Sequence, residues 1–225
     1  MKYTKPQDSV PLPEAMAGLP KDTRGYPIPW IVMRDRHGVA HFTINDHTKV
    51  RQCAKFGLCG ICGKALGTHV PKNPLKGAYF VGGPACFYST RGAFLDPPMH
   101  RECAEYALRV CPYIANPSYG KSIGVGALTG DATPAGIAVI EHDASPGLGS
   151  KPPLFILGLA RRWTYMEHEP GQLLFKPTNP RRDWVHLSAW RDGEMLDINS
   201  REVRDEIFAR LMTHAVAQNR TQQGV

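Results

Sequence analysis

Two pairs of side chains in this chain have the types and spacing of metal ligands. Cys59 and Cys62 are separated by two residues, and so are His100 and Cys103. The first spacing lets two thiolates reach one ion from a tight turn, and the second puts both groups on one face of a helix. Three thiolates and one imidazole around one ion form a closed tetrahedral site of the structural kind. We therefore expect these four residues to bind one structural Zn²⁺.

Four other cysteine or histidine residues are either alternative ligands or structural residues near this set. Cys111 lies near the same helix face as the second pair, where it is either a replacement ligand or a buried thiol. His69 follows the first pair closely and is a second possible replacement. Cys53 and Cys86 lie outside the paired spacing and fit core positions. A redox role for the first pair is disfavoured, because its CxxC turns into a loop instead of opening a helix.

The segments around the ligands predict a treble-clef-like zinc core. Residues 26–44 contain strand-like runs on either side of the turn "DRHG" and predict a β-hairpin, and residues 45–57 predict a short helix or turn. Residues 78–95 contain two aromatic-rich runs separated by "GGP", which predicts a second hairpin. A helix is expected over 100–111, with Pro112 ending it. A Cys-rich turn, a hairpin and a ligand-bearing helix follow one another in a treble clef.

The second half predicts more antiparallel strands and a terminal helix. Strand-like runs occupy residues 153–177 and 184–194. Residues 199–219 predict an amphipathic helix, with Asn199 and Glu202 as a capping box. The apolar face of this helix would consist of Val203, Ile207, Leu211 and Ala215.

Composition places the chain among loop-rich α+β proteins. It has 225 residues with 20 Pro and 22 Gly, and its 42% hydrophobic and 21% charged content is typical of globular proteins. Residues 1–23 are expected to be a loose, flexible arm, and 24–115 the zinc-binding domain. Residues 116–153 form a Gly/Pro-rich connection to residues 154–225, which are either a second unit or packed with 24–115 as one domain.

The charge and the N-terminus bear on partners and location. The net charge is +7, with the excess in the first half and spread thinly, which permits a nucleic-acid or acidic-protein partner without identifying one. No apolar run is long enough to span a membrane, and the N-terminus lacks the apolar run of a signal peptide. We therefore expect a cytoplasmic protein whose cysteines are thiols or metal ligands.

Two arginine pairs stand beside tryptophans, in the segments Arg161-Arg162-Trp163 and Arg181-Arg182-Asp183-Trp184. If these segments lie on neighbouring strands, the guanidinium groups can hold phosphates while a tryptophan stacks on bases. The alternative is that both tryptophans are core residues flanked by solvated arginines. In that case Glu167 and Glu169 would pair with the arginines across the strands.

Two enzyme classes deserve comparison with this pattern. An HNH-type nuclease also has a treble-clef core, and its spare candidates here would be His41, Asn45, Asp46 and His47. These residues precede the Cys pair instead of lying between it and the helix, so the order fits poorly. A zinc deaminase needs a Pro-Cys-x-x-Cys after its His-x-Glu, and none follows "HRE". The sequence thus favours a non-enzymatic protein.

Several motifs resemble those of a family of uncharacterised zinc-finger proteins found in bacteriophages, prophages and bacterial genomes. The matching stretches are "RGYPIPWIV" (24–32), "LCGICGKALG" (58–67), "YFVGGP" (79–84), "DPPMHRECAEYALRVCPYIA" (96–115) and, more loosely, "WRDGEMLDINSREV" (190–203). The family tends to carry a paired Trp where this chain has "SAW". The resemblance implies a phage-associated, zinc-binding protein of the host cytoplasm, and it implies no particular activity.

Two functions from different classes follow as expectations. The first is a structural-zinc module that binds nucleic acid through the two arginine pairs. The second is a protein-binding adaptor or inhibitor of a host machine, such as an anti-defence factor. Binding to nucleic acid would weaken steeply with salt because of counterion release, which separates the first from the second.

Overall fold

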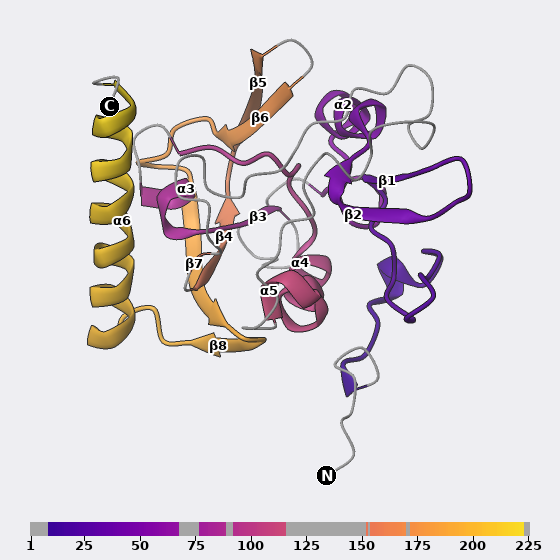
Figure 1. The fold of residues 1–225 in the computed structure, drawn as a ribbon, viewed down its shortest axis with the longest axis horizontal. Helices are drawn as coiled ribbons and strands as arrows, with labels where there is room; N and C mark the ends of the chain where they lie inside the picture. Colours follow the sequence, from indigo (N-terminus) through magenta and orange to yellow (C-terminus); the bar gives the residue numbers. More distant parts are fainter. Residues whose placement is uncertain are drawn as a thin grey trace.

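Four antiparallel strands form the central sheet in the order β3-β4-β7-β8 (Figure 1). They are β3 (Ala78–Gly82), β4 (Phe155–Ala160), β7 (Trp184–Arg191) and β8 (Glu194–Leu196). They belong to a computed structural model that describes residues 9–67, 77–88, 92–115, 152, 154–169 and 172–222. One strand from the N-terminal half therefore shares a sheet with three strands from the C-terminal half. The expected connection over 116–153 lies outside the described residues except for Pro152.

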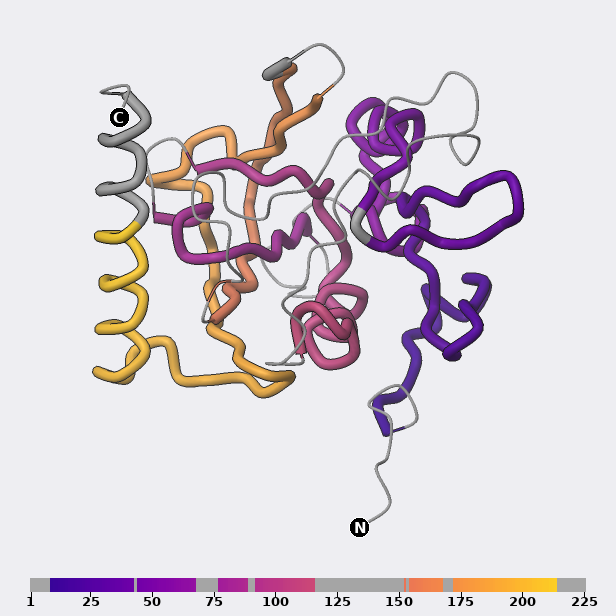
Figure 2. The backbone as a smooth tube through the Cα atoms, in the orientation of Figure 1, coloured from indigo at the N-terminus to yellow at the C-terminus, as the bar shows by residue number. Residues whose placement is uncertain are grey.

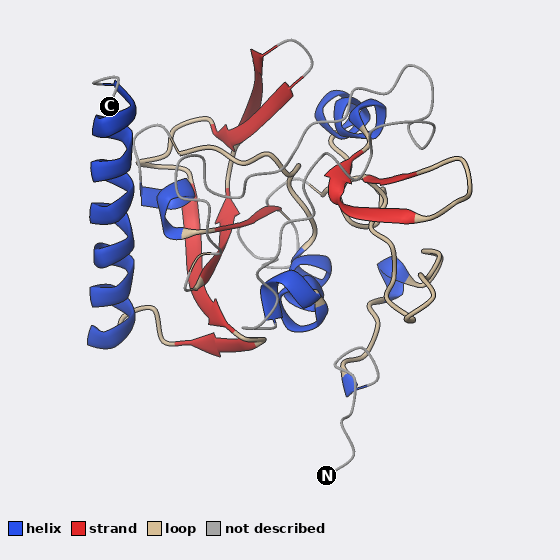
Figure 3. Cartoon of the chain, viewed as in Figure 1, coloured by secondary structure: helices blue, strands red, loops and turns tan. Residues whose placement is uncertain are grey.

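Both faces of the sheet are covered, which explains why β4 has the unbroken apolar sequence FILGLA. All of its residues are buried. Phe155 and Leu157 point into one hydrophobic cluster, whereas Ile156 between them points into the other. Figure 3 shows helices on either side of the sheet strands. The fold is thus α+β, with a sheet between two layers of other elements.

Helices α3 (Pro84–Tyr88) and α6 (Arg201–Gln222) lie on one side of the sheet (Figure 1). Val203 and Ile207 of α6 are 3% and 7% exposed, which confirms the predicted apolar face at these two positions. The sheet comes close to α3 at Gly158, where an added Cβ would lie 2.4 Å from the Phe87 ring. A larger residue at this position would push α3 away from the sheet.

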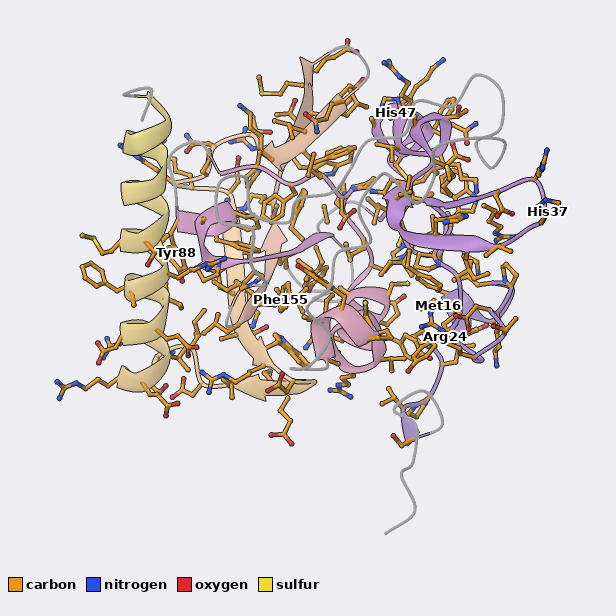
Figure 4. The ribbon with its side chains drawn as sticks, viewed as in Figure 1. Met16, Arg24, His37, His47, Tyr88 and Phe155 are labelled. Carbon is orange, nitrogen blue, oxygen red and sulfur yellow. The ribbon has the colours of Figure 1, made fainter. Side chains whose placement is uncertain are left out.

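The opposite side of the sheet is covered by α4 (Arg101–Val110), which continues after its end into α5 (Pro112–Ala115). Figure 4 marks Phe155, which contributes to the cluster on this side. The Arg109 guanidinium lies 5.4 Å from the ring centroid of Trp190, a β7 residue that is 2% exposed. The predicted helix before Pro112 is confirmed, and it packs directly on the sheet.

The N-terminal half adds a hairpin and a helix, both predicted correctly. Strands β1 (Val32–Arg34) and β2 (Ala40–Asn45) pair antiparallel, and α2 (His47–Phe56) follows them. The Asp46 carboxylate caps α2 by accepting hydrogen bonds from the backbone N–H groups of the next residues. Gly57 ends the helix with a left-handed φ of 63°.

The strands between β4 and β7 form a second hairpin that rises from the sheet. It consists of β5 (Trp163–Glu169) and β6 (Gln172–Pro177), which pair antiparallel. Figure 2 follows the backbone from β4 up through this hairpin and back down into β7. The antiparallel strands predicted for the second half are therefore confirmed.

The hairpin predicted for residues 78–95 is wrong in its second run. Pro84 begins the helix α3 instead of a turn, which suits the fixed φ of proline at the first helical position. The partner of β3 is β4, and Phe94 makes an isolated antiparallel bridge with Phe175 of β6. The aromatic residues of this segment therefore pair with strands far along the chain.

The predicted capping box of α6 is wrong as well. The Ser200 hydroxyl accepts the Val203 N–H at 3.3 Å, so Ser200 caps the helix. The N–H of Asn199 instead donates to the Asp197 carboxylate at 2.9 Å. The side chain of Ala215 lies outside the described part of the chain.

The N-terminal residues expected as a loose arm include a packed segment. The short 3-10 helix Glu14–Met16 places Met16 at 2% exposure in the cluster beside α4 (Figure 4). The Ile28 N–H donates to the Pro20 carbonyl at 2.8 Å, which folds the chain back on itself. This segment therefore belongs to the core next to the ligand-bearing helix.

Candidate metal centre and arginine cluster

The four predicted ligands converge on one point. The ligand atoms of Cys59, Cys62, His100 and Cys103 all lie within 4.8 Å of one another. The three cysteines are at most 8% exposed, and His100 is partly buried. These residues are close enough to bind a single metal ion, and three thiols with one imidazole suit one structural zinc. Among the described alternatives, Cys53, Cys86 and Cys111 do not belong to this group. His69 lies outside the described residues.

A tight turn presents the first two ligands. The Gly63 N–H donates to the Cys59 carbonyl at 2.9 Å, and the Cys59 N–H donates to the Lys64 carbonyl at 2.8 Å. Gly63 has a φ of 72°, and an added Cβ would lie 2.7 Å from the Trp30 indole. Glycine is therefore required here for both the left-handed backbone and the packing of Trp30.

Backbone hydrogen bonds join this turn to the segment that carries the other two ligands. The Gly60 N–H donates to the Pro98 carbonyl at 3.1 Å, and Tyr79 and Met99 exchange hydrogen bonds of 2.9 and 2.8 Å. Pro97 and Pro98 are fully buried. The chain entering α4 is thereby fixed against both the turn and strand β3, so the ligand positions are set by the fold around them.

The His100 ring is oriented as metal-bound histidines are. Its Nε2 lies 3.0 Å from the Ala65 carbonyl oxygen, which accepts hydrogen bonds only, so Nε2 carries the proton. The remaining nitrogen, Nδ1, faces the Cys62 sulfur at 3.3 Å. Nδ1 is thus the nitrogen available for a metal, with a backbone carbonyl holding the other side of the ring. The Ala65 carbonyl was not predicted, because backbone acceptors leave no mark in side-chain motifs.

Hydrogen bonds among the sulfur atoms shift the pKa values of Cys59 and Cys103 in opposite directions. Burial would raise the pKa of the Cys59 thiol, but hydrogen bonds with Cys103 and Cys62 and with backbone N–H groups lower it to about 3. Hydrogen bonds to Cys59 and Cys62, together with burial, raise the pKa of Cys103. Metal binding would displace the protons that these thiols carry.

The two predicted arginine pairs lie in adjacent turns, which we call the arginine cluster. The turn between β4 and β5 carries Arg161 and Arg162, and the turn between β6 and β7 carries Arg181 and Arg182. The Arg161 N–H donates to the Asp183 carbonyl at 2.7 Å, so the two turns are joined. All four arginines are exposed.

Asp183 joins the two turns, and its side chain is only 2% exposed. Its Oδ1 accepts from Arg162 at 3.2 Å, and its Oδ2 accepts the Asn179 N–H at 2.6 Å. Arg161, Arg181 and Arg182 have no ion pair with any residue that the structure describes. Sequence reasoning missed the role of Asp183, for which its place after the turn-forming pair Asn179-Pro180 was the available signal.

The two tryptophans beside the arginines pack against the core. The Trp184 ring centroid lies 4.8 Å from that of Phe87 and 5.9 Å from that of Phe80. Trp163 lies 6.1 Å from the buried Phe175 and is partly buried. The geometry therefore favours the core interpretation for both. The predicted pairing of Glu167 with these arginines is wrong, since Glu167 pairs with Arg51 of α2 at 3.0 Å.

The residues considered for a nuclease site have other roles. Asn45 donates to the Asp96 carboxylate at 2.9 Å, and His41 contacts Asp35 at 3.2 Å. Asp46 caps α2, and His47 is its first residue. Within the described ranges, the Cys/His group above is the single cluster suited to a metal.

Comparison with family models, with curated proteins and with solved structures finds no match to this chain. Among the described residues, no helix is long and apolar enough to cross a membrane.

Proposed function

We propose that Cys59, Cys62, His100 and Cys103 bind one structural zinc ion between the Cys-rich turn and the start of α4. The support is the ligand chemistry of three thiolates and one imidazole, their burial, and the orientation of His100 by the Ala65 carbonyl. The chain supplies all four positions of a tetrahedron, which leaves none for a substrate. Such a closed site stabilises a fold and performs no chemistry.

Elemental analysis of the purified chain tests this assignment. We expect one zinc per folded chain, bound stoichiometrically and removed only by a strong chelator. A folded chain without metal, or one that prefers another ion in direct competition, would overturn it.

We further propose that the protein binds nucleic acid through the arginine cluster. The observation that carries this proposal is the concentration of four exposed arginines in two turns joined through Asp183, three of which have no ion pair with a described residue. Guanidinium groups suit phosphate because they donate in a rigid fork. Their turns are fixed by backbone hydrogen bonds, so little backbone ordering is needed when a phosphate chain binds. The motif resemblance supports a phage setting for this activity.

A matched pair of double variants tests the site. Arg181→Gln with Arg182→Gln removes two charges from the cluster, whereas Arg201→Gln with Arg204→Gln removes two exposed charges from α6. We expect fluorescence anisotropy with labelled oligonucleotides at low salt to show weaker binding for the first variant alone. Equal weakening by both variants would mean that only net charge matters, and no binding by the unaltered protein would reject the function.

A protein-binding adaptor is the second candidate, favoured by an apolar surface on α6. Phe208 and Met212 lie one helical turn apart and are 64% and 52% exposed. Exposed apolar pairs of this kind occur at protein interfaces. Phe208→Ser with Met212→Ser would abolish such an interface while leaving oligonucleotide binding intact, which separates this candidate from the first.

A further inference from the structure

Strand β5 carries a second aromatic residue away from the arginine cluster. Tyr165 lies two residues beyond Trp163, so both rings lie on one face of the β5–β6 hairpin. Unlike Trp163, Tyr165 is 46% exposed. The hairpin projects from the sheet at this point (Figure 1). A flat aromatic surface therefore stands about 10 Å along the strand from Arg162, by the rise of three strand residues.

The Tyr165 ring packs beside a buried aromatic ring on the neighbouring strand. Its cross-strand partner is Phe175, which is fully buried, and the two ring centroids are 6.3 Å apart. Phe175 also contacts Trp163 at 6.1 Å, so one buried ring supports both neighbours. A phenol anchored in this way loses little freedom when a further ring stacks on its exposed face.

We propose that the hairpin selects single-stranded nucleic acid, with an unpaired base stacking on Tyr165 while the arginine cluster holds the adjoining phosphates. This inference rests on the proposed nucleic-acid function and specifies its substrate. The bases of a duplex are stacked on each other and present only their edges, so an exposed ring has no base face to meet there. In a single strand each base is free to stack on an aromatic side chain, whatever its identity.

The negative charge of Glu167 on β5 marks the end of the proposed binding surface. Glu167 lies two residues beyond Tyr165 and is paired with Arg51 of α2 at 3.0 Å. A carboxylate at this position repels a phosphate chain, and its arginine partner is already engaged. The binding surface is therefore short, running from the arginine turns to Tyr165, and recognition is by shape and stacking without a base-edge code.

Two tyrosines of equal exposure provide the test. Tyr165→Leu removes the stacking ring, and Tyr88→Leu removes a ring that is 45% exposed on α3, outside the proposed surface. Tyr165→Phe keeps the ring and removes the hydroxyl. The probes are oligo-dT, oligo-U and a mixed-sequence DNA duplex of the same length, each titrated with metal-loaded protein.

We expect Tyr165→Leu to weaken binding of the single strands about five- to 150-fold and Tyr165→Phe to retain it, because stacking of one base is lost only in the first. Tyr88→Leu should bind as the unaltered protein does. Tighter binding of oligo-dT would identify single-stranded DNA as the ligand, and tighter binding of oligo-U would identify RNA. Duplex binding equal to single-strand binding, or equal effects of the two Leu variants, would overturn this inference while leaving the proposed function standing. Failure of every probe to bind would reject both.

Discussion

The metal centre and the arginine cluster are both assembled from distant segments, yet they differ in where their polar groups face. The sulfur atoms of the metal centre point inward, and Cys59 and Cys103 are fully buried. The guanidinium groups of the arginine cluster are exposed, and its one buried group, Asp183, faces back into the turns. The ligand groups of the metal centre contact one another, whereas most guanidinium groups of the arginine cluster face solvent.

This difference separates what stabilises the molecule from what it can bind. In the proposed zinc site, four protein ligands leave no position for a substrate, so a bound ion would contribute to the stability of the fold. Exposed cations contribute little stability, since even an exposed ion pair is worth only about 0–1 kcal/mol. In the proposed function these cations attract the phosphates of a nucleic acid.

Loss of a metal ligand should give the largest effect. Structural zinc supplies about 10–16 kcal/mol of apparent binding free energy in small domains, which is as large as the whole stability of a typical domain. We expect Cys103→Ala to lose zinc and cooperative unfolding, as followed by circular dichroism. Cys111→Ala, a partly buried cysteine outside the metal group, should cost about 1 kcal/mol and keep the metal. Equal effects of the two variants would contradict a metal-centred fold.

Acidification should give the second-largest effect, again at the metal centre. Thiolate and imidazole ligands bind zinc only when deprotonated, so protons compete with the metal and affinity falls as the pH falls. We expect zinc release to a chromogenic chelator to accelerate from neutral to acid pH, with unfolding of the α4 side of the sheet. A release rate independent of pH would argue that the thiols are not the ligands.

Changing the buried carboxylate of the arginine cluster should give an intermediate effect. Asp183→Asn sets an amide donor against groups that already donate, so we expect a loss of about 1–3 kcal/mol in the free energy of unfolding by urea. Asp205→Asn alters an ion pair whose carboxylate is 73% exposed, and should change it by less than about 0.5 kcal/mol. If Asp183→Asn proved as mild as this control, the two turns would not depend on Asp183.

The metal ligands could be predicted from the sequence because their signal is local. Cys59 with Cys62, and His100 with Cys103, each carry a spacing that fixes two ligands within one turn of chain. Three thiols and one imidazole then leave few ways to complete a tetrahedron. Structure places all four within 4.8 Å of one another.

The predictions that were wrong concern contacts between segments that are far apart in the sequence. The run after β3 was expected to form the other strand of a hairpin, but the edge of β3 is satisfied by β4. The core interpretation of the tryptophans paired Glu167 with the arginines of the two arginine pairs, whereas Glu167 forms an ion pair with Arg51 of α2. The arginine cluster lies in the half of the chain with little net charge, so composition could not reveal it. Only the register between the two turns brings its members together.

The salt dependence of binding tests the division between the two regions most directly. Each phosphate contact contributes about 0.7 to the slope of log K against log salt for a single strand. We predict that Arg181→Gln with Arg182→Gln lowers this slope by about 1.4 in metal-loaded protein, with an unchanged melting temperature, while Arg201→Gln with Arg204→Gln leaves the slope intact. An unchanged slope in the first variant, or an equal decrease in both, would contradict the account.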